Sequence, residues 1–280
     1  MIIRVLVDNE TSQKDLGAEH GLSILLEFER KKVLFDFGQS LLLFKNTEAM
    51  GIDLSDVDYA ILSHGHYDHG GGLKHFMEIC PGAPVYIRKD AFDGHYALRE
   101  DKRIEEIGLS PLIGNGVVFT AEEHQVEKGV MLFSVPPAKE LEPSGNRILF
   151  QKDDSGCYIR DSFMHEQNLL IEKDGVTLLV AGCAHRGIVN ILEWVKKKYQ
   201  IIPQFVVGGF HLRNTLDDEQ TEDLALRRIA KYLIGTQAKY FTGHCTGLAS
   251  YQKLKSILGD RIEYAEAGSV LAISKGANES

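Results

Sequence analysis

The segment Ser63-His64-Gly65-His66-Tyr67-Asp68-His69-Gly70-Gly71-Gly72 places three histidines and one aspartate within six consecutive positions. It follows the apolar run 59–62, which predicts a β-strand, so the four side chains belong to the turn after that strand. Neutral imidazole and carboxylate groups are ligands that borderline divalent metals prefer. Neighbouring residues project in different directions, which favours two ions, one bound by His64 and His66 and one by Asp68 and His69. A polar turn with only local hydrogen bonds would fit this one-sided composition poorly.

The order of these ligands resembles a known signature. The pattern His64-x-His66-x-Asp68-His69, after an apolar strand and before glycines, is similar to that of the metallo-β-lactamase fold superfamily. The sequence Leu-Phe-Asp-Phe-Gly at 34–38 resembles the early strand and turn of the same superfamily. Four further segments resemble the branch named for the methanopterin-pathway synthase of dihydropterin-aminobenzene-ribofuranosyl phosphate: Glu19–Ser23, Gly182–His185, Gly208–Leu212 and Gly243–Gly247.

The composition of the 280-residue chain is that of an ordinary globular protein, with 44% apolar and 25% charged residues. No apolar run approaches the roughly 18 residues that span a bilayer, and the run 1–7 predicts a first strand rather than a leader. We therefore expect a cytoplasmic protein without a membrane association. Two of the four cysteines lie in histidine-containing motifs, which favours reduced thiols over a disulfide framework. The cysteines are Cys80, Cys157, Cys183 and Cys245.

The net charge of −9 arises from 31 Lys and Arg against 40 Asp and Glu. Proteins that bind polyanions usually carry a basic surface, so nucleic acid is a poor candidate for the partner. A small anionic substrate remains compatible with this charge, because two bound dications would reverse the local potential of the site. The sequence makes no prediction of the oligomeric state.

Short β-rich runs dominate the first third of the chain, and the last third alternates strands with longer amphipathic helices. The spacing of apolar residues predicts a helix over 187–199. Periodicity alone indicates an α/β fold with mixed sheets. The resemblance implies more, namely a single domain over 1–280 built as a four-layer αββα sandwich of two mixed β-sheets flanked by helices. Residues 136–161 are rich in turn formers and are predicted to be either a flap over the site or a plain surface insertion.

Three later histidines share one context, the end of a predicted strand next to glycine: His185, His211 and His244. Ligands on rigid elements hold their geometry best. The resemblance implies that His244 completes the second of the two metal sites described above, and His185 is the best candidate to complete the first. His211 is predicted either to act on the substrate, as a proton donor or a phosphate contact, or to orient a ligand through a hydrogen bond.

Two departures from the superfamily pattern concern the number of metals. Cys183 stands where a bridging aspartate is usual, and it is either a thiolate ligand or a buried small hydrophobe. The histidine expected before the preceding strand is missing from its usual place, and His165 and Glu166 are the nearest candidates. The centre is therefore either dinuclear or built on one tightly held metal with a weak partner.

Several polar residues are predicted to support the site or to lie outside it. Asp36 is expected to orient metal-ligating histidines rather than to bind metal, and His20, next to Glu19, is expected to reach the mouth of the site. Three histidines without a supporting motif are predicted to lie on the surface: His75, His95 and His124.

These observations predict metal-assisted hydrolysis of a small anionic ester or phosphoester, with Asp68 and His211 in catalytic roles. Zinc is the first expectation from the ligand types, and iron or manganese also suits them. The resemblance implies a second possible activity, that of a metal-dependent synthase or transferase that joins a pterin to an aminobenzene ribofuranosyl phosphate. Three further functions compete with these: nonenzymatic metal binding, a flavodiiron-type redox role and nucleic-acid processing. The glycines 70–72 are weak evidence for a nucleotide-binding loop, because the lysine pattern of such loops is absent.

Overall fold

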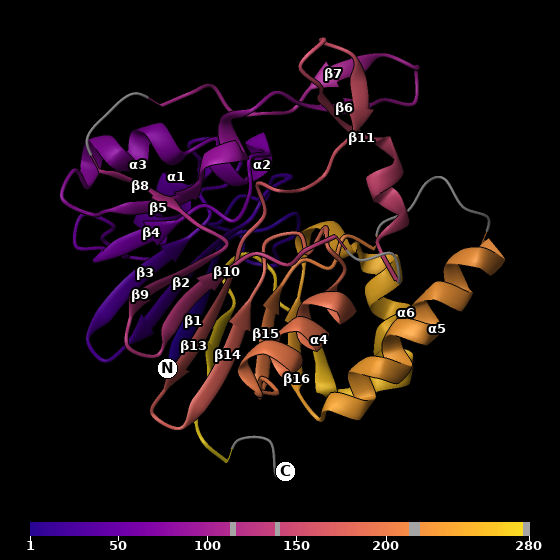
Figure 1. Ribbon diagram of the computed structural model, residues 1–280. Helices are drawn as coiled ribbons and strands as arrows, with labels where there is room; N and C mark the ends of the chain where they lie inside the picture. The colour runs from indigo at the N-terminus through magenta and orange to yellow at the C-terminus, as the bar shows by residue number, and fades with distance from the viewer. Residues whose placement is uncertain (113–115, 138–140, 213–218, 277–280) are drawn as a thin grey trace. The chain divides into compact units, whose positions relative to one another are not determined.

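The computed structural model describes residues 1–112, 116–137, 141–212 and 219–276 (Figure 1). The chain divides into two compact units. Unit 1 comprises Met1–Ala121, Ile148–Gln167 and Glu266–Ile273, and unit 2 comprises Glu122–Arg147, Asn168–Ala265 and Ser274–Ser280. The prediction of one domain over 1–280 stays a prediction. Among the residues described, no helix combines the length and the apolar character needed to cross a membrane.

Unit 1 is built on a seven-stranded mixed sheet with the strand order β18-β1-β2-β3-β4-β5-β8. Its first three strands in sequence and β18 pair antiparallel, whereas β3, β4, β5 and β8 run parallel to one another. Parallel strands end at the same edge of a sheet, so the residues that follow β3 and β4 are neighbours there. The strands are β1 (Ile2–Val7), β2 (Ser23–Phe28), β3 (Lys31–Phe35), β4 (Tyr59–Ile61), β5 (Val85–Arg88), β8 (Val117–Thr120) and β18 (Val270–Ala272).

Two helices of unit 1 pack against this sheet. Helix α1 (Leu42–Ala49) contributes Leu43, and helix α3 (Leu73–Ile79) contributes Phe76, to one buried apolar cluster with sheet residues such as Leu34. The short helix α2 (Tyr67–Gly70) lies between them in the sequence and carries part of the histidine motif.

A second, four-stranded sheet of unit 1 has the order β12-β11-β6-β7 and is antiparallel throughout. Much of the segment predicted to be a flap belongs to it, because Leu149–Arg160 forms the hairpin of β11 and β12. Residues 138–140 of that segment lie outside the described residues. The role of the segment as a flap stays a prediction. The strands are β6 (His95–Leu98), β7 (Ile104–Glu106), β11 (Leu149–Lys152) and β12 (Tyr158–Arg160).

Unit 2 is built on a seven-stranded mixed sheet with the order β17-β16-β15-β14-β13-β10-β9. The strands β14 to β17 run parallel, and helices α4 (Ile188–Tyr199), α5 (Glu219–Thr236) and α6 (Leu248–Leu258) connect them in turn. The predictions of mixed sheets with helices and of a helix over 187–199 are therefore confirmed. The strands are β9 (Glu123–Glu127), β10 (Val130–Phe133), β13 (Asn168–Lys173), β14 (Val176–Val180), β15 (Phe205–Gly208), β16 (Lys239–Thr242) and β17 (Ile262–Tyr264).

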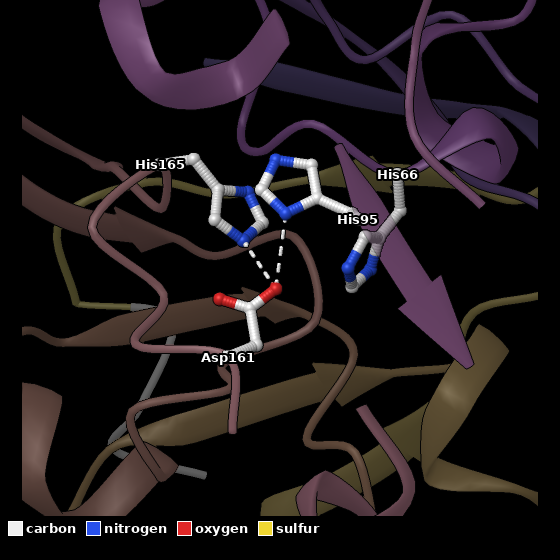
Figure 2. Close-up of side chains that lie close together, drawn as sticks. All are labelled: His66, His95, Asp161 and His165. Carbon is white, nitrogen blue, oxygen red and sulfur yellow. Dashed lines mark hydrogen bonds and ion pairs between the residues drawn. The ribbon is translucent and has the colours of Figure 1, made fainter. Parts of the chain in front are cut away.

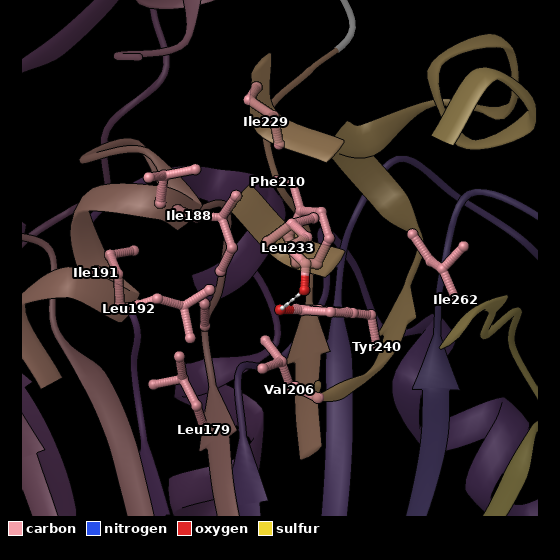
Figure 3. Close-up of a cluster of buried hydrophobic side chains, with 14 of the residues drawn as sticks. Leu179, Ile188, Ile191, Leu192, Val206, Phe210, Ile229, Leu233, Tyr240 and Ile262 are labelled. Carbon is pink, nitrogen blue, oxygen red and sulfur yellow. Dashed lines mark hydrogen bonds between the residues drawn. The ribbon is translucent and has the colours of Figure 1, made fainter. Parts of the chain in front are cut away.

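The three helices of unit 2 pack on one face of its sheet. Leu179 on β14, Val206 on β15 and Tyr240 on β16 point into a buried cluster with residues of all three helices (Figure 3). The Tyr240 hydroxyl is satisfied there, because it lies 2.6 Å from Thr236 Oγ1 and 3.3 Å from the carbonyl oxygen of Leu233. This close-packed layer holds the strand ends that carry the later histidine motifs.

Replacing Leu179 with alanine should lower the free energy of unfolding by about 2–5 kcal/mol, because the side chain is fully buried and its removal leaves a cavity. Leu224→Ala is the matched control, since Leu224 on α5 is 62% exposed, and it should change stability by less than about 0.5 kcal/mol. Urea denaturation of both variants makes the comparison. Equal losses would contradict this assignment of the core.

Candidate metal centre

The four side chains of the histidine motif are positioned by β4 and α2. The turn after β4 carries His64 and His66, and α2 carries Asp68 and His69. All four are buried, with exposed fractions between 0% and 7%. Titratable groups buried together are costly unless hydrogen bonds or a metal ion satisfy them. Their hydrogen bonds therefore show which atoms are engaged by the protein and which atoms suit a metal.

Asp36 anchors this motif from the end of β3. Its Oδ2 lies 2.7 Å from Nδ1 of His69, and its Oδ1 accepts a hydrogen bond from the backbone N–H of Ser63 at 2.7 Å. The Ser63 hydroxyl donates to Asp36 Oδ2 at 2.7 Å and lies 2.8 Å from Nδ1 of His64. The prediction that Asp36 orients histidines agrees with these contacts.

Donor counting assigns the protons of these two rings. The Asp36 carboxylate only accepts, so Nδ1 of His69 donates to it. The single hydroxyl proton of Ser63 goes to Asp36, so Nδ1 of His64 donates to the serine oxygen. In the neutral form, a ring with its proton on Nδ1 carries its lone pair on Nε2. A carboxylate that fixes the tautomer of a histidine in this way is typical of metal sites.

Asp68 and His69 fit one divalent ion. Oδ2 of Asp68 lies 3.5 Å from Nε2 of His69, which is close to the separation of about 3.4 Å between two tetrahedral ligands of zinc. His20 Nε2 lies 3.3 Å from the same oxygen, and the His20 side chain is 49% exposed. His20 therefore reaches the edge of this group from solvent, as predicted.

Beside His66 lies a second buried group, consisting of His95, Asp161 and His165 (Figure 2). One ligand atom from each of the four residues lies within 4.8 Å of the others. Oδ2 of Asp161 lies 3.0 Å from Nδ1 of His95 and 3.4 Å from Nε2 of His165. Although burial opposes ionisation, the two histidines hold the pKa of Asp161 well below its usual range. An ionised carboxylate is therefore the centre of this group.

Hydrogen bonds engage the rings of His95 and His165. Both ring nitrogens of His95 face acceptors, Asp161 Oδ2 and the carbonyl oxygen of Asp90 at 3.1 Å. Nδ1 of His165 accepts the backbone N–H of Gly65 at 2.9 Å, so its Nε2 carries the proton directed at Asp161. His165 holds the backbone between the first two histidines of the motif.

The environment of His66 favours its neutral form. Burial, together with the neighbouring His165, keeps the pKa of His66 well below its usual value. The neutral imidazole is the form that binds a metal. His66, in the group of Figure 2, is therefore in a form suited to a metal.

The prediction that His95 lies on the surface is wrong, since only 2% of it is exposed. Alternate residues of β6 are buried, and His95 lies on the buried side, where it meets Asp161. His75 is confirmed as a surface residue, with 41% of its side chain exposed, and His124 is partly exposed.

The backbone of Gly65 leaves no room for a side chain. A Cβ atom there would lie 2.1 Å from the carbonyl oxygen of Ala91. The close approach of these two segments allows the Gly65 amide to meet His165, and it fixes the separation of His64 and His66 along the turn.

In unit 2 the later motifs follow the parallel strands β14, β15 and β16. His185 is held by Asn146, whose side-chain oxygen lies 3.0 Å from Nδ1 of His185 and whose amide donates to the His185 carbonyl at 2.7 Å. The His185 and His211 rings lie 4.3 Å apart between centroids. Sequence reasoning missed Asn146, because nothing local to it marks a partner that is distant in the chain.

The buried cysteines Cys183 and Cys245 form another group with the partly exposed His211, with one ligand atom from each within 4.8 Å. The backbone N–H of His211 donates to Cys245 Sγ at 3.2 Å. Burial raises the pKa of the Cys245 thiol, but contacts with Cys183, His244 and His211 outweigh it and hold that pKa well below its usual value. Sulfur and imidazole together suit zinc. Cys245 lies in the segment Gly243–Gly247, but its sequence context alone does not indicate its place in this group.

Backbone strain marks the same strand ends. Positive φ angles occur at four non-glycine residues in or beside the predicted ligands, where they cost about 1–3 kcal/mol each. Such conformations persist where the surrounding structure imposes them, and they gather at functional sites. The residues are Asp36 (62°), Ala184 (53°), His211 (48°) and His244 (47°).

The chain is similar to several known proteins. Residues 16–154 match the family model of the metallo-beta-lactamase superfamily. The uncharacterized protein MJ0448 of Methanocaldococcus jannaschii is 32% identical over 274 residues, which cover 97% of this chain and 100% of that protein. The 7,8-dihydropterin-6-methyl-4-(beta-D-ribofuranosyl)-aminobenzene-5'-phosphate synthase of the same organism is 29% identical over 283 residues, with 91% and 90% covered. The crystal structure of Tm1679, described as a metal-dependent hydrolase of the beta-lactamase superfamily, matches with a TM-score of 0.80 at 31% identity and covers 98% of this chain and 100% of its own.

Replacing Asp36 with asparagine should weaken zinc binding by about 10- to 100-fold. The amide no longer accepts every donor around it, so the ring of His69 loses the partner that fixes its tautomer. The measurement is a titration of metal-free protein with zinc against a chromophoric chelator. Asp58→Asn is the control, because Asp58 is a partly exposed carboxylate that pairs with Lys31. Equal zinc affinity in Asp36→Asn and the unaltered protein would remove Asp36 from the site.

Proposed function

The chain belongs to the metallo-beta-lactamase superfamily, and we propose that it is a metal-dependent hydrolase acting on a small anionic ester or phosphoester. The observation that carries the proposal is the hydrogen bonding of His64 and His69. Ser63 and Asp36 contact the Nδ1 atoms of these two rings, and histidines whose second nitrogen is held by a carboxylate or hydroxyl are typical of metal sites.

The proposed ligands come from both halves of the sequence. His64, His66, Asp68 and His69 are the proposed ligands of unit 1, for one or two divalent ions. Those of unit 2 are His244, which the superfamily resemblance implies, His185, which is the best candidate to complete the first metal site, and Cys183, which stands where the superfamily usually has an aspartate. Zinc suits this set best because it accepts nitrogen, oxygen and sulfur together, while iron or manganese suits the histidine and carboxylate part.

The proposed ligands would hold a dication that, when bound, would lower the pKa of water to roughly 7 in the case of zinc and would polarise the ester. The protein's own residues prepare the site for this. Asp36 fixes the ring of His69, and His20 contacts the Asp68 carboxylate at 3.3 Å, which restrains its rotation. The proposed proton donor to the leaving group is His211, whose buried Nδ1 has no hydrogen-bond partner among the described residues.

His66→Ala should abolish hydrolysis by removing a metal ligand. The measurements are metal content by elemental analysis and turnover of bis(p-nitrophenyl) phosphate, a generic phosphodiester. His75→Ala is the matched control, because His75 is a surface histidine of the same unit, and it should keep both metal and turnover. Turnover that persists in His66→Ala with full metal content would overturn the proposal. The absence of metal-dependent turnover on every ester tested would instead favour a nonenzymatic metal-binding protein.

His211→Ala should keep the full metal content and lower turnover by about 100-fold or more, as expected for loss of a general acid. His124→Ala, a partly exposed histidine of the same unit, is the control. An unchanged rate removes His211 from the mechanism. Loss of metal together with activity would make His211 a ligand with Cys183 and Cys245 rather than a proton donor.

The relative named as a synthase favours a second candidate function, because it covers 91% of this chain at 29% identity. The chain would then join a pterin to an aminobenzene ribofuranosyl phosphate and use the same metal to stabilise a phosphate or a departing pyrophosphate. Mass spectrometry of a reaction containing both substrates separates the two functions. A joined product supports the synthase, and a product of hydrolysis alone supports the hydrolase.

A further inference from the structure

Unit 2 contains a cavity of about 570 Å³ between helices α4 and α5, whose positions are visible in Figure 1. Its apolar wall includes Leu192 on α4, Ile202 in the following loop and the ring of Tyr232 on α5. Ile202 is 50% exposed, which is unusual for a large apolar side chain that lines a concave surface. The volume lies within the range of about 300–1,000 Å³ that is typical of small-molecule sites.

Three cations line the same cavity. Lys196 lies on α4, and Arg228 and Lys231 lie on the face of α5 that also carries Tyr232. Within the described part of the chain, none of the three forms an ion pair. The nearby acid Glu193 is engaged, since its Oε1 accepts the hydroxyl of Tyr232 at 2.6 Å.

This concentration of positive charge needs an explanation, because the whole chain carries a net charge of −9. All three cations are exposed to solvent, where their charges attract an anion from a distance and salt screens that attraction. A simple inorganic anion would satisfy the cations but would leave the apolar wall exposed. The geometry points to a binding site for a small amphipathic anion, with an aromatic or aliphatic body and one phosphate, sulfonate or carboxylate group.

The site is separate from the candidate metal ligands of unit 2. The candidate ligands Cys183 and His185 precede α4 in the sequence. The α4 residues that line the cavity, Leu192 and Lys196, lie further along the helix. The rise of a helix places Lys196 about 12 Å along the axis from the first residue of α4. No residue that lines the cavity is among the proposed metal ligands. An anion bound here occupies an accessory site, so the inference does not depend on the proposed hydrolase activity.

The first test uses 8-anilinonaphthalene-1-sulfonate, a fluorescent aromatic anion, with the full-length protein. The unaltered protein should bind one equivalent, with an affinity that falls as salt is added. The double variant Arg228→Gln/Lys231→Gln should bind about tenfold more weakly or worse. Arg227→Gln/Lys197→Gln is matched in charge and uses exposed residues of the same helices outside the cavity, so it should bind as the unaltered protein does.

A second variant blocks the cavity without changing its charge. Gly235 lines the cavity, and a Cβ built on it meets no atom within 4 Å. Gly235→Leu therefore fits the helix and fills the space, and it should weaken binding of the dye by about tenfold or more. N-phenyl-1-naphthylamine, which lacks the sulfonate, should bind the unaltered protein more weakly than the anion does.

The outcomes decide the inference. Binding that survives both the double variant and Gly235→Leu overturns it, and so does an equal loss in the Arg227/Lys197 control or the absence of saturable binding. Equal affinity for the neutral dye would show an apolar pocket without anion selectivity, which also contradicts the proposal. Circular dichroism of each variant separates loss of the site from loss of the fold.

Discussion

The buried carboxylate of Asp36 is the constraint on which the geometry of the histidine motif depends. Asp36 is fully buried, and an ionised group in that position is costly unless several donors satisfy it. The backbone and hydroxyl of Ser63 and the ring of His69 are those donors. Because Asp36 requires a proton from His69, the protein fixes which nitrogen of that ring remains for another partner. The parallel pairing of β3 with β4 makes this possible, since it places Asp36 beside the start of the motif.

A second buried carboxylate constrains the motif through the backbone. Asp161 fixes His165, and His165 accepts the amide of Gly65, which is 100 positions away in the sequence. The two carboxylates therefore act on different parts of one turn, Asp36 on the backbone of Ser63 and the ring of His69, and Asp161, through His165, on the backbone of Gly65. Neither needs to contact a metal for its loss to alter the ligands. His95 and His165, which lie close to His66, are held in place by this arrangement.

The parts of the site that were predicted from the sequence are those with a local signal. The spacing of the histidine motif and its place after an apolar run indicate a metal site, and the apolar period over 187–199 predicts α4. Asp36 was recognised because it ends a strand that resembles a known element. The missed residues have no such signal. His95 and Asp161 are 66 positions apart, and each alone looks like a polar residue in a variable segment.

The structure of the segment 136–161 depends on pairing with a distant strand. Its turn formers suggest a loop, but β11 pairs with β6, which lies more than 50 residues earlier and cannot be identified by local composition. The same is true of Asn146, whose contact with His185 joins a 3₁₀ turn to a strand end 39 positions away. Turn-rich composition predicts where the chain reverses. It does not predict which distant strand or side chain meets the reversal.

In unit 2, the strained backbone lies at the strand ends, and the apolar packing that stabilises the fold lies between the sheet and its helices. The ends of its parallel strands carry left-handed residues and buried polar groups, each of which costs free energy in the folded protein. The layer of Leu179, Val206 and Tyr240 beneath the helices contributes in the opposite direction, through apolar burial and close packing. A ligand that binds only the folded strand ends adds stability there by mass action, about 2.7 kcal/mol at 100 times its dissociation constant. Ligand binding and the stability of the strand ends are thus thermodynamically linked. A substitution that weakens ligand binding should therefore be tested for its effect on affinity and on the free energy of unfolding.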